Sequence, residues 1–134
     1  MKFRYKRYNS HLRPVIPLKV KYGERAITYS ALVDSGADSC LFDTQVAAEL
    51  GIDLDKNGVP ARVGGIAGQT ATYFIHPVTI EIGGWPFEIQ AGFIPLVAGR
   101  FNYGVVGQEG FFDKFKVIFD LEKEEIELRP RQTS

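Results

Sequence analysis

The segment Asp34-Ser35-Gly36-Ala37-Asp38 holds the residues of this chain that are best suited to chemistry. It directly follows the apolar residues Ala31-Leu32-Val33. A strand that ends in Asp-Ser-Gly places a carboxylate on a tight loop, beside a small hydroxyl and a residue free to take unusual backbone angles. Such a loop presents an acid at the floor of a cleft, where it can accept or donate protons. Because Asp, Ser and Gly are also common turn residues, the tripeptide alone fits an ordinary turn as well.

Runs of β-branched and aromatic residues dominate the chain and predict a mostly β protein. The clearest strands come in pairs joined by turn residues, which is typical of hairpins. One pair covers residues 14–22 and 26–33, and another covers 71–82 and 87–94 around Gly83-Gly84. A third hairpin is expected near the end, at 116–121 and 125–129. The Asp34 loop therefore follows the second strand of the first hairpin.

Two short helices are expected between these strands. Residues 45–50 follow Asp43 and Thr44, which are good N-cap types, and they stop at Gly51. Residues 109–115 are expected to form the second helix and to place Phe111, Phe112 and Phe115 against a core.

A faint internal repeat accompanies these elements. Residues 17–23 resemble residues 77–83, which lie 60 positions later. Each copy is a hairpin that leads to a turn, at 33–36 and at 104–107, and each turn is followed by a predicted helix. Duplication of a half-domain explains this order. The alternative is a chance likeness between two hairpins of a β protein.

Composition and charge limit the possible partners. A chain of 134 residues is expected to form one domain over residues 1–134, with 1–13 as an N-terminal strand or extension. Lys plus Arg and Asp plus Glu number 16 each, so no overall field attracts nucleic acid or a membrane. Cys40 is the single cysteine, and no signal-like or membrane-spanning stretch is present in the sequence, which predicts a cytoplasmic protein. His11 and His76 lie too far apart to suggest a metal site, and no cofactor is expected.

The chain resembles the retroviral-type (retropepsin-like) aspartic proteases, a family of single-domain, homodimeric enzymes. The resemblance covers residues 14–129 and rests on the 32–38 loop, the glycine-rich residues 63–68 where the family has its flap, the apolar-apolar-Gly at 105–107, and the helix expected after it. Ser35 stands where many members have threonine. Gln108-Glu109 replaces the Arg-Asn that commonly follows the glycine in viral members.

The resemblance implies a fold, an activity and a set of site residues. The implied fold is mostly β, a closed β-barrel of the acid-protease type with an internal pseudo-two-fold repeat. The implied activity is that of an aspartic endopeptidase acting on extended peptide or protein substrates, with one Asp34 from each subunit of a homodimer. The implied catalytic residues are Asp34, Ser35 and Gly36. The implied substrate-binding residues are Ala37, Asp38, Gly64, Gly65, Ile66, Ala67, Gly68, Val105 and Val106.

Other functions remain open at this point. A non-catalytic retropepsin-fold module that binds peptides or dimerises would keep the fold without hydrolysis, and a generic β-barrel ligand-binding domain would leave Asp34 inert. Asp38 fits a structural turn as well as a substrate contact. Cys40 is expected in the core and Trp85 at a hairpin tip, packed on a neighbour. The basic first residues and the acidic 122–127 segment fit either two solvated edges or a pair of terminal strands.

Overall fold

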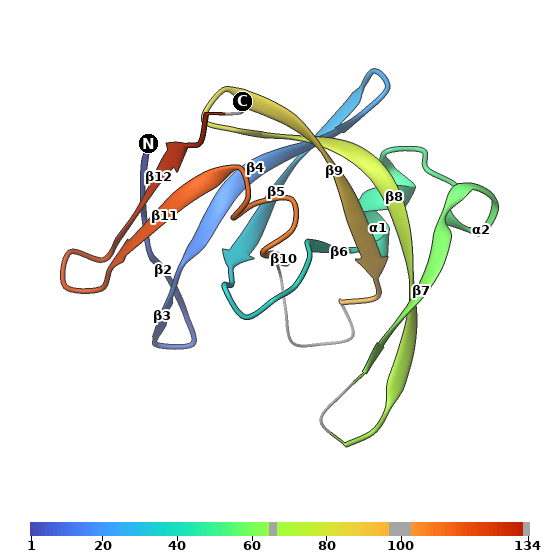
Figure 1. The fold of residues 1–134 in the computed structure, drawn as a ribbon, viewed down its shortest axis with the longest axis horizontal. Helices are drawn as coiled ribbons and strands as arrows, with labels where there is room; N and C mark the ends of the chain where they lie inside the picture. Colours follow the sequence, from blue (N-terminus) through green and yellow to red (C-terminus); the bar gives the residue numbers. More distant parts are fainter. Residues whose placement is uncertain (65–66, 97–102, 133–134) are drawn as a thin grey trace.

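The computed structural model describes residues 1–64, 67–96 and 103–132. The chain is mostly β with two short helices (Figure 1). The elements are β1 (Lys2–Arg4), β2 (Lys6–Tyr8), β3 (His11–Arg13), β4 (Val15–Tyr22), β5 (Arg25–Val33), β6 (Leu41–Asp43), α1 (Thr44–Glu49), α2 (Leu54–Asn57), β7 (Val59–Gly64), β8 (Thr70–Ile82), β9 (Trp85–Ile94), β10 (Gly104–Val106), β11 (Phe115–Asp120) and β12 (Glu125–Pro130).

Two long hairpins, β4–β5 and β8–β9, form most of the seven-stranded sheet. Both were predicted from their alternating apolar residues and glycine turns, and their strand ends lie within two residues of the predicted ones. The first strands of the two hairpins also pair with each other, antiparallel, with Val20 opposite Ile80. These two residues are 60 positions apart, so the two copies of the repeat meet at equivalent positions. An ion pair of 2.8 Å between Lys21 and Glu81 lies beside this contact.

The centre of the large sheet interleaves strands from both halves of the chain. Its order is β4-β5-β10-β6-β9-β8-β7. The short strand β10 lies parallel to β5 and antiparallel to β6, and β6 in turn lies parallel to β9. The loop between β5 and β6 is therefore placed against the end of β10. Closure of this sheet into a barrel stays a prediction.

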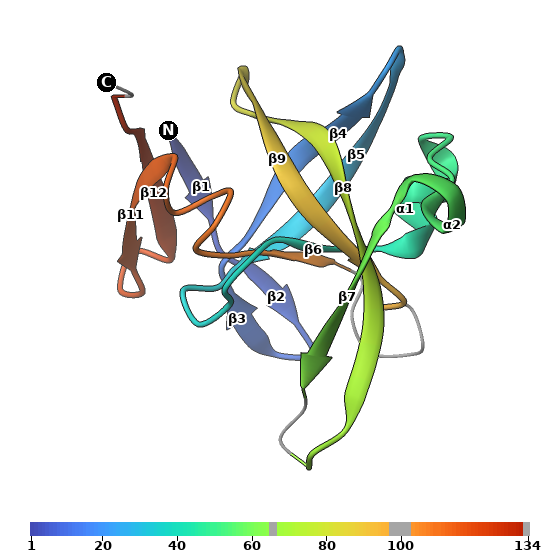
Figure 2. The ribbon, with the colours of Figure 1, turned by 45° about the vertical axis from the view of Figure 1, so that its right-hand side comes forward.

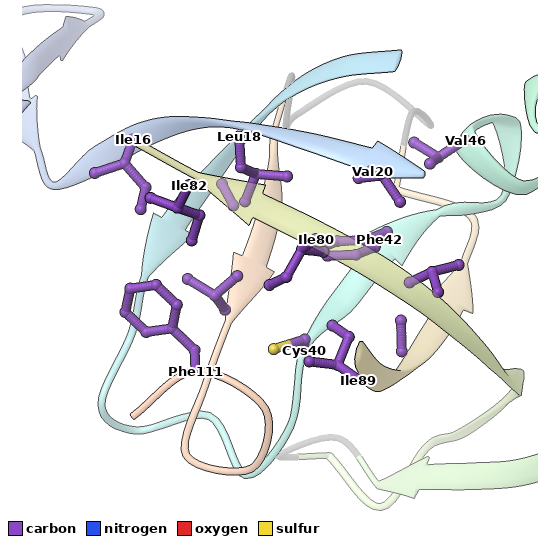
Figure 3. Close-up of a cluster of buried hydrophobic side chains, with 14 of the residues drawn as sticks. Ile16, Leu18, Val20, Cys40, Phe42, Val46, Ile80, Ile82, Ile89 and Phe111 are labelled. Carbon is purple, nitrogen blue, oxygen red and sulfur yellow. The ribbon is translucent and has the colours of Figure 1, made fainter. Parts of the chain in front are cut away.

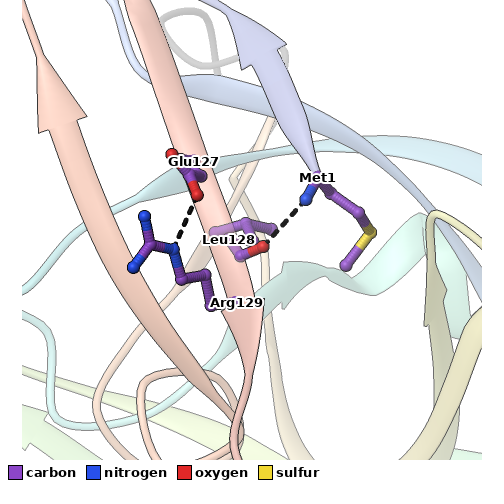
Figure 4. A network of polar contacts seen from close by, with 4 residues as sticks. All are labelled: Met1, Glu127, Leu128 and Arg129. Carbon is purple, nitrogen blue, oxygen red and sulfur yellow. Dashed lines mark hydrogen bonds and ion pairs between the residues drawn. The ribbon is translucent and has the colours of Figure 1, made fainter.

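A separate three-stranded sheet joins the two ends of the chain in the order β1-β12-β11 (Figure 2). The register places Lys2 opposite Glu127, so the terminal strands do pair, and they pair within the chain. The Met1 ammonium donates a 3.0 Å hydrogen bond to the Leu128 carbonyl, and Arg129 Nε donates one of 2.7 Å to Glu127 Oε2 (Figure 4). The hydrogen bond from Arg129 lowers the pKa of the Glu127 carboxyl. The strands β2 and β3 form their own small hairpin within residues 1–13.

The hydrophobic core lies between the strands of the large sheet and the turns that precede β11 (Figure 3). Phe42 of β6 is completely buried in it, with its ring 5.6 Å from that of Tyr29 and 6.0 Å from that of Phe93. These contacts join β5, β6 and β9, and burying each ring contributes about 1.5–3 kcal/mol. Phe111 and Phe115 are also buried, as predicted.

The helix predicted at residues 109–115 is wrong. This segment forms consecutive turns, in which the Phe112 and Asp113 amides donate to carbonyls five residues back, at Gly107 and Gln108. Gly110 has φ of 101°, which no α-helix allows. The Asp113 carboxylate accepts the Gly110 amide at 3.1 Å and fixes the turn. Among the described residues the second short helix is instead α2.

The structure contains no helix, among the residues that it describes, that is long and apolar enough to cross a membrane.

Candidate active site

Asp34 begins a tight loop at the end of β5. Its own amide donates to the Val106 carbonyl at 3.0 Å, which continues the pairing between β5 and β10 by one residue. The Gly36 amide donates to Asp34 Oδ1 at 2.9 Å, and the Ala37 amide donates to the Asp34 carbonyl at 3.2 Å. These bonds close the turn expected for Asp-Ser-Gly and orient the half-buried carboxylate of Asp34.

The segment after β10 is hydrogen-bonded to the same loop. The Gln108 amide donates to the Ala37 carbonyl and the Glu109 amide to the Asp38 carbonyl, both at 2.9 Å. The Gln108 side chain adds a third contact, because its Nε2 donates to the Ser35 carbonyl at 2.7 Å. Residues 34–38 are thus tied to residues 106–109 by four hydrogen bonds, including the Asp34 amide to Val106.

Gly107 permits this close approach. A Cβ atom at position 107 would lie 2.5 Å from the Ala37 carbonyl oxygen and 2.6 Å from that of Ser39. Both contacts are with backbone atoms, which have no room to move without displacing the loop. The glycine of the apolar-apolar-Gly motif is therefore required by packing against the Asp34 loop.

The predicted site residues differ in their exposure. Ser35, Gly36 and Asp38 are exposed, and Ala37 is half-buried. The Asp38 carboxylate makes no hydrogen bond or ion pair with any residue that the structure describes. The Asx-turn alternative for this residue therefore has no support in the described contacts.

The two valines of the site have different surroundings. Val105 is half-buried, whereas Val106 is fully buried. The Val106 side chain therefore supports the loop from inside the core.

A pocket of about 440 Å³ opens beside the loop. Gly36, Ala37, Asp38 and Ser39 form one wall, and the β7–β8 hairpin contributes Arg62, Gly64 and Tyr73, with Leu41 of β6 between them. This volume falls within the roughly 300–1,000 Å³ typical of ligand sites. The pocket brings the predicted Ala37, Asp38 and Gly64 together.

The described part of the β7–β8 tip holds two more of the predicted flap residues. Ala67 and Gly68 are exposed there, and Gly68 has φ of 78°, which suits a turn. The predicted residues Gly65 and Ile66 lie outside the described residues.

Five residues near the site were not named by the sequence analysis as site residues: Ser39, Leu41, Arg62, Tyr73 and Gln108. One signal pointed indirectly to two of them. Gly92 in β9 has no room for a Cβ atom, which would lie 2.6 Å from the Leu41 side chain and 2.9 Å from the Tyr73 ring. A glycine inside a predicted strand indicates such a close neighbour, but it does not identify the neighbour.

The other candidate residues take structural positions. Cys40 is completely buried, as predicted, and burial raises the pKa of its thiol to about 11. His76 is buried in β8 with its ring 5.1 Å from that of Tyr22, and His11 is exposed in β3. Among the described residues no group of three or more His, Cys, Asp or Glu side chains could hold a metal ion. Trp85 is at the hairpin tip but is 53% exposed.

Comparison with known proteins agrees with this geometry. The fold, together with the Asp-Ser-Gly loop seated on an apolar-apolar-Gly segment, defines a retropepsin-like protein. The aspartyl protease family matches residues 16–109, and the chain belongs to this family. A retropepsin-like aspartic protease from Rickettsia conorii has a similar solved structure, with a TM-score of 0.68 and 20% sequence identity over 96% of this chain and 89% of that one. No curated protein sequence matches the chain.

Proposed function

We propose that the chain is an aspartic endopeptidase that hydrolyses peptide bonds of extended polypeptides, with one Asp34 from each subunit of a homodimer. The observation that carries this proposal is the Asp34 carboxylate on a loop fixed by hydrogen bonds at both ends, beside an open pocket. Membership of the aspartyl protease family supports it.

Two copies are required by the chemistry. Hydrolysis of this kind needs two carboxylates around one water, and the chain has a single Asp-Ser-Gly. Where the second half of the repeat has its equivalent turn, the residues are Val105, Val106 and Gly107, which bring no carboxylate. A second Asp34 across a two-fold axis supplies the missing acid.

The proposed reaction uses the two carboxylates as acid and base. Like charges at close range do not both ionise, so the pair holds one proton. The ionised Asp34 takes a proton from the water while the oxygen of this water bonds to the peptide carbon. The protonated Asp34 gives its proton to the carbonyl oxygen. Collapse of the tetrahedral intermediate breaks the C–N bond: the leaving nitrogen takes up the proton that one Asp34 received from the water, and a hydroxyl of the intermediate gives its proton to the other Asp34, so the dyad again holds one proton.

The neighbouring residues receive roles that fit their positions. Ser35 is exposed at the loop tip and would hydrogen-bond across the dimer interface. Gly36 lets its backbone approach Asp34. The exposed carboxylate of Asp38 would accept hydrogen bonds from substrate amides as the peptide adds a strand to the site. The β7–β8 tip, residues 64–68, would close over the substrate and exclude water.

A cleavage assay tests the proposal. The full chain and Asp34→Asn are incubated with a mixed peptide library from acidic to neutral pH, with and without a statine-type inhibitor. We expect cleavage by the wild-type chain alone, abolished by the inhibitor. Cleavage that persists in Asp34→Asn would refute the mechanism. Cleavage by neither protein would favour the peptide-binding or dimerisation module.

A dilution series tests the requirement for two copies. Specific activity is expected to fall as the protein is diluted through its dimer dissociation constant, because each subunit supplies half of the site. Constant specific activity from a protein that is monomeric by light scattering would contradict it.

A cytoplasmic location is likewise proposed, from the single cysteine. Cys40 is buried and free, so the structure does not depend on an oxidising compartment.

A further inference from the structure

A second pocket lies away from the Asp34 loop, where the tip of the β8–β9 hairpin meets the ends of β11 and β12. We call it the Trp85 pocket, and its volume is about 250 Å³. It is lined by Trp85, Pro86, Phe87, Lys114, Phe115, Pro130 and Arg131. The volume is below the roughly 300–1,000 Å³ usual for small-molecule sites, and it suits one side chain of a protein partner.

The Trp85 pocket has an apolar floor and a basic rim. The rings of Phe87 and Phe115 meet edge to face at 5.4 Å on the floor. Lys114 and Arg131 form no ion pair with any described residue, and Arg131 Nε donates to the Phe112 carbonyl at 3.0 Å, which fixes the guanidinium at the rim. Such a pocket fits an apolar side chain that has carboxylates beside it.

The chain itself carries a segment of this kind. The turn between β11 and β12 and the strand residue on each side of it, residues 120–125, which we call the acidic turn, contain Asp120, Glu122, Glu124 and Glu125 against one lysine. Leu121 at its start is 65% exposed, and Phe119 just before it is 42% exposed. These two residues and Trp85 are three of the five exposed large hydrophobic residues among those described.

The acidic turn and the Trp85 pocket lie at opposite ends of β11. The strand has six residues, so the two sites are about 20 Å apart. The acidic turn projects at one side of the molecule, whereas the β8–β9 tip lies near the other end of the hairpin (Figure 1). The turn therefore reaches a Trp85 pocket only in another copy of the chain.

We propose that the acidic turn of each copy binds the Trp85 pocket of a second copy, with Leu121 in the pocket and its neighbouring glutamates against Lys114 and Arg131. Two antiparallel β11 strands related by a two-fold axis bring both turns to both pockets, so the contact forms twice and the assembly closes. Within the described residues β11 pairs only with β12, which leaves its other edge open to this approach. The two-fold symmetry rests on the proposed function, and the surface is new.

Charge reversal on each side of the contact gives a sharp test. One variant carries Lys114→Glu and Arg131→Glu, and the other carries Glu122→Lys and Glu124→Lys. Asp120 is left unchanged because its carboxylate accepts the Lys123 amide at 3.1 Å and holds the turn. Each variant alone brings like charges together twice, whereas a mixed pair has opposite charges at both contacts.

Sedimentation of the full chains measures the outcome. We expect the wild-type chain to dimerise, each variant alone to raise the dimer dissociation constant by about 100-fold, and an equimolar mixture to return to dimers. Leu121→Ser, on an exposed side chain, is expected to weaken the dimer while the chain stays folded. Matched circular dichroism spectra verify that all variants fold.

Several outcomes would overturn the inference: a monomeric wild-type chain, variants that dimerise as the wild type does, a mixture that stays monomeric, or open-ended assemblies larger than dimers. Asp34→Asn separates the two proposals, because it is expected to dimerise normally. A wild-type dimer that cleaves no peptide would refute the protease and leave this contact standing. An active enzyme whose dimer dissociation constant is unchanged by the charge reversals would refute this contact and leave the protease standing.

Discussion

The side chain of Gln108 donates a 2.7 Å hydrogen bond to the Ser35 carbonyl, and the backbone amide of Gln108 donates a second bond to the Ala37 carbonyl. One residue from the second half of the chain thus grips the Asp-Ser-Gly loop at two points. The Ser35 carbonyl and the Gly36 amide belong to one peptide group, and this amide donates to Asp34 Oδ1 at 2.9 Å, so the first of these bonds fixes the peptide that orients the carboxylate.

Replacing Gln108 with alanine is expected to lower kcat about tenfold while KM changes little. The lost hydrogen bond contributes about 0.5–1.5 kcal/mol, and 1.4 kcal/mol corresponds to a factor of ten in rate. The loop still forms, because the backbone bonds remain, but it holds Asp34 less firmly in the transition state. Steady-state kinetics on a cleaved peptide, with melting temperatures measured in parallel, check this expectation.

Gln108→Glu and Gln90→Ala are the matched controls for that experiment. Gln108→Glu keeps the shape of the side chain but turns an acceptor towards the Ser35 carbonyl, so it should lower kcat at least as much as Gln108→Ala. Gln90 is exposed on β9 and its side chain has no hydrogen bond among the described residues, so Gln90→Ala should leave kcat unchanged. A wild-type kcat for Gln108→Ala would show that the side-chain bond has no positioning role.

Gly107→Ala is expected to destabilise the fold by about 1–3 kcal/mol. The added Cβ atom would lie 2.5 Å and 2.6 Å from two backbone oxygens, and relieving these contacts moves the Asp34 loop. Gly64→Ala is the control, since its Cβ atom would meet nothing within 4 Å. Urea unfolding of both variants measures the difference, and equal midpoints would mean that the loop yields without cost.

The hairpins were predictable from the sequence because their signals are local. Alternating apolar residues and glycine turns defined β4–β5 and β8–β9 to within two residues. The insertion of β10 between β5 and β6 was not predictable in this way, because three residues carry no periodicity and their partners are about 60–75 positions away. The helix expected at 109–115 failed at Gly110, whose φ of 101° depends on the Asp113 carboxylate and the packing below it.

The candidate site was likewise predictable only where its signals are local in the sequence. The Asp34 loop and its support at 105–107 were visible as motifs in sequence. The opposite wall of the pocket was predicted only as a glycine-rich segment. In the sequence Tyr73 is an ordinary aromatic residue of a strand, and only the fold brings it near Leu41 in the pocket wall. The bond from Gln108 to Ser35 joins residues 73 positions apart, and no local pattern predicts a contact of that separation.

Asp43 is expected to stabilise the fold more than Asp53, although both cap short helices. Asp43 is buried, and its carboxylate accepts the Gln45 amide at 2.9 Å and the Leu96 amide at 2.7 Å. Asp53 accepts only the Lys56 amide, at 3.2 Å, in an exposed position. Asp43→Ala should therefore cost about 2 kcal/mol or more and Asp53→Ala about 0.5–1 kcal/mol in thermal unfolding. Equal losses would show that the Leu96 contact contributes nothing.

The buried thiol of Cys40 is expected to make the free energy of unfolding depend on pH in the alkaline range. Burial raises the pKa of its thiol from 9.0 to about 11, so the folded state favours the neutral thiol. The resulting stability is fully present below pH 9 and is lost as the pH rises through 11, with a total of about 2–3 kcal/mol. Cys40→Ala lacks this titration, so the difference in unfolding free energy between it and the wild-type chain should shrink between pH 9 and 11. A difference that stays constant over this range would show that the thiol ionises as easily in the folded chain as in the unfolded one.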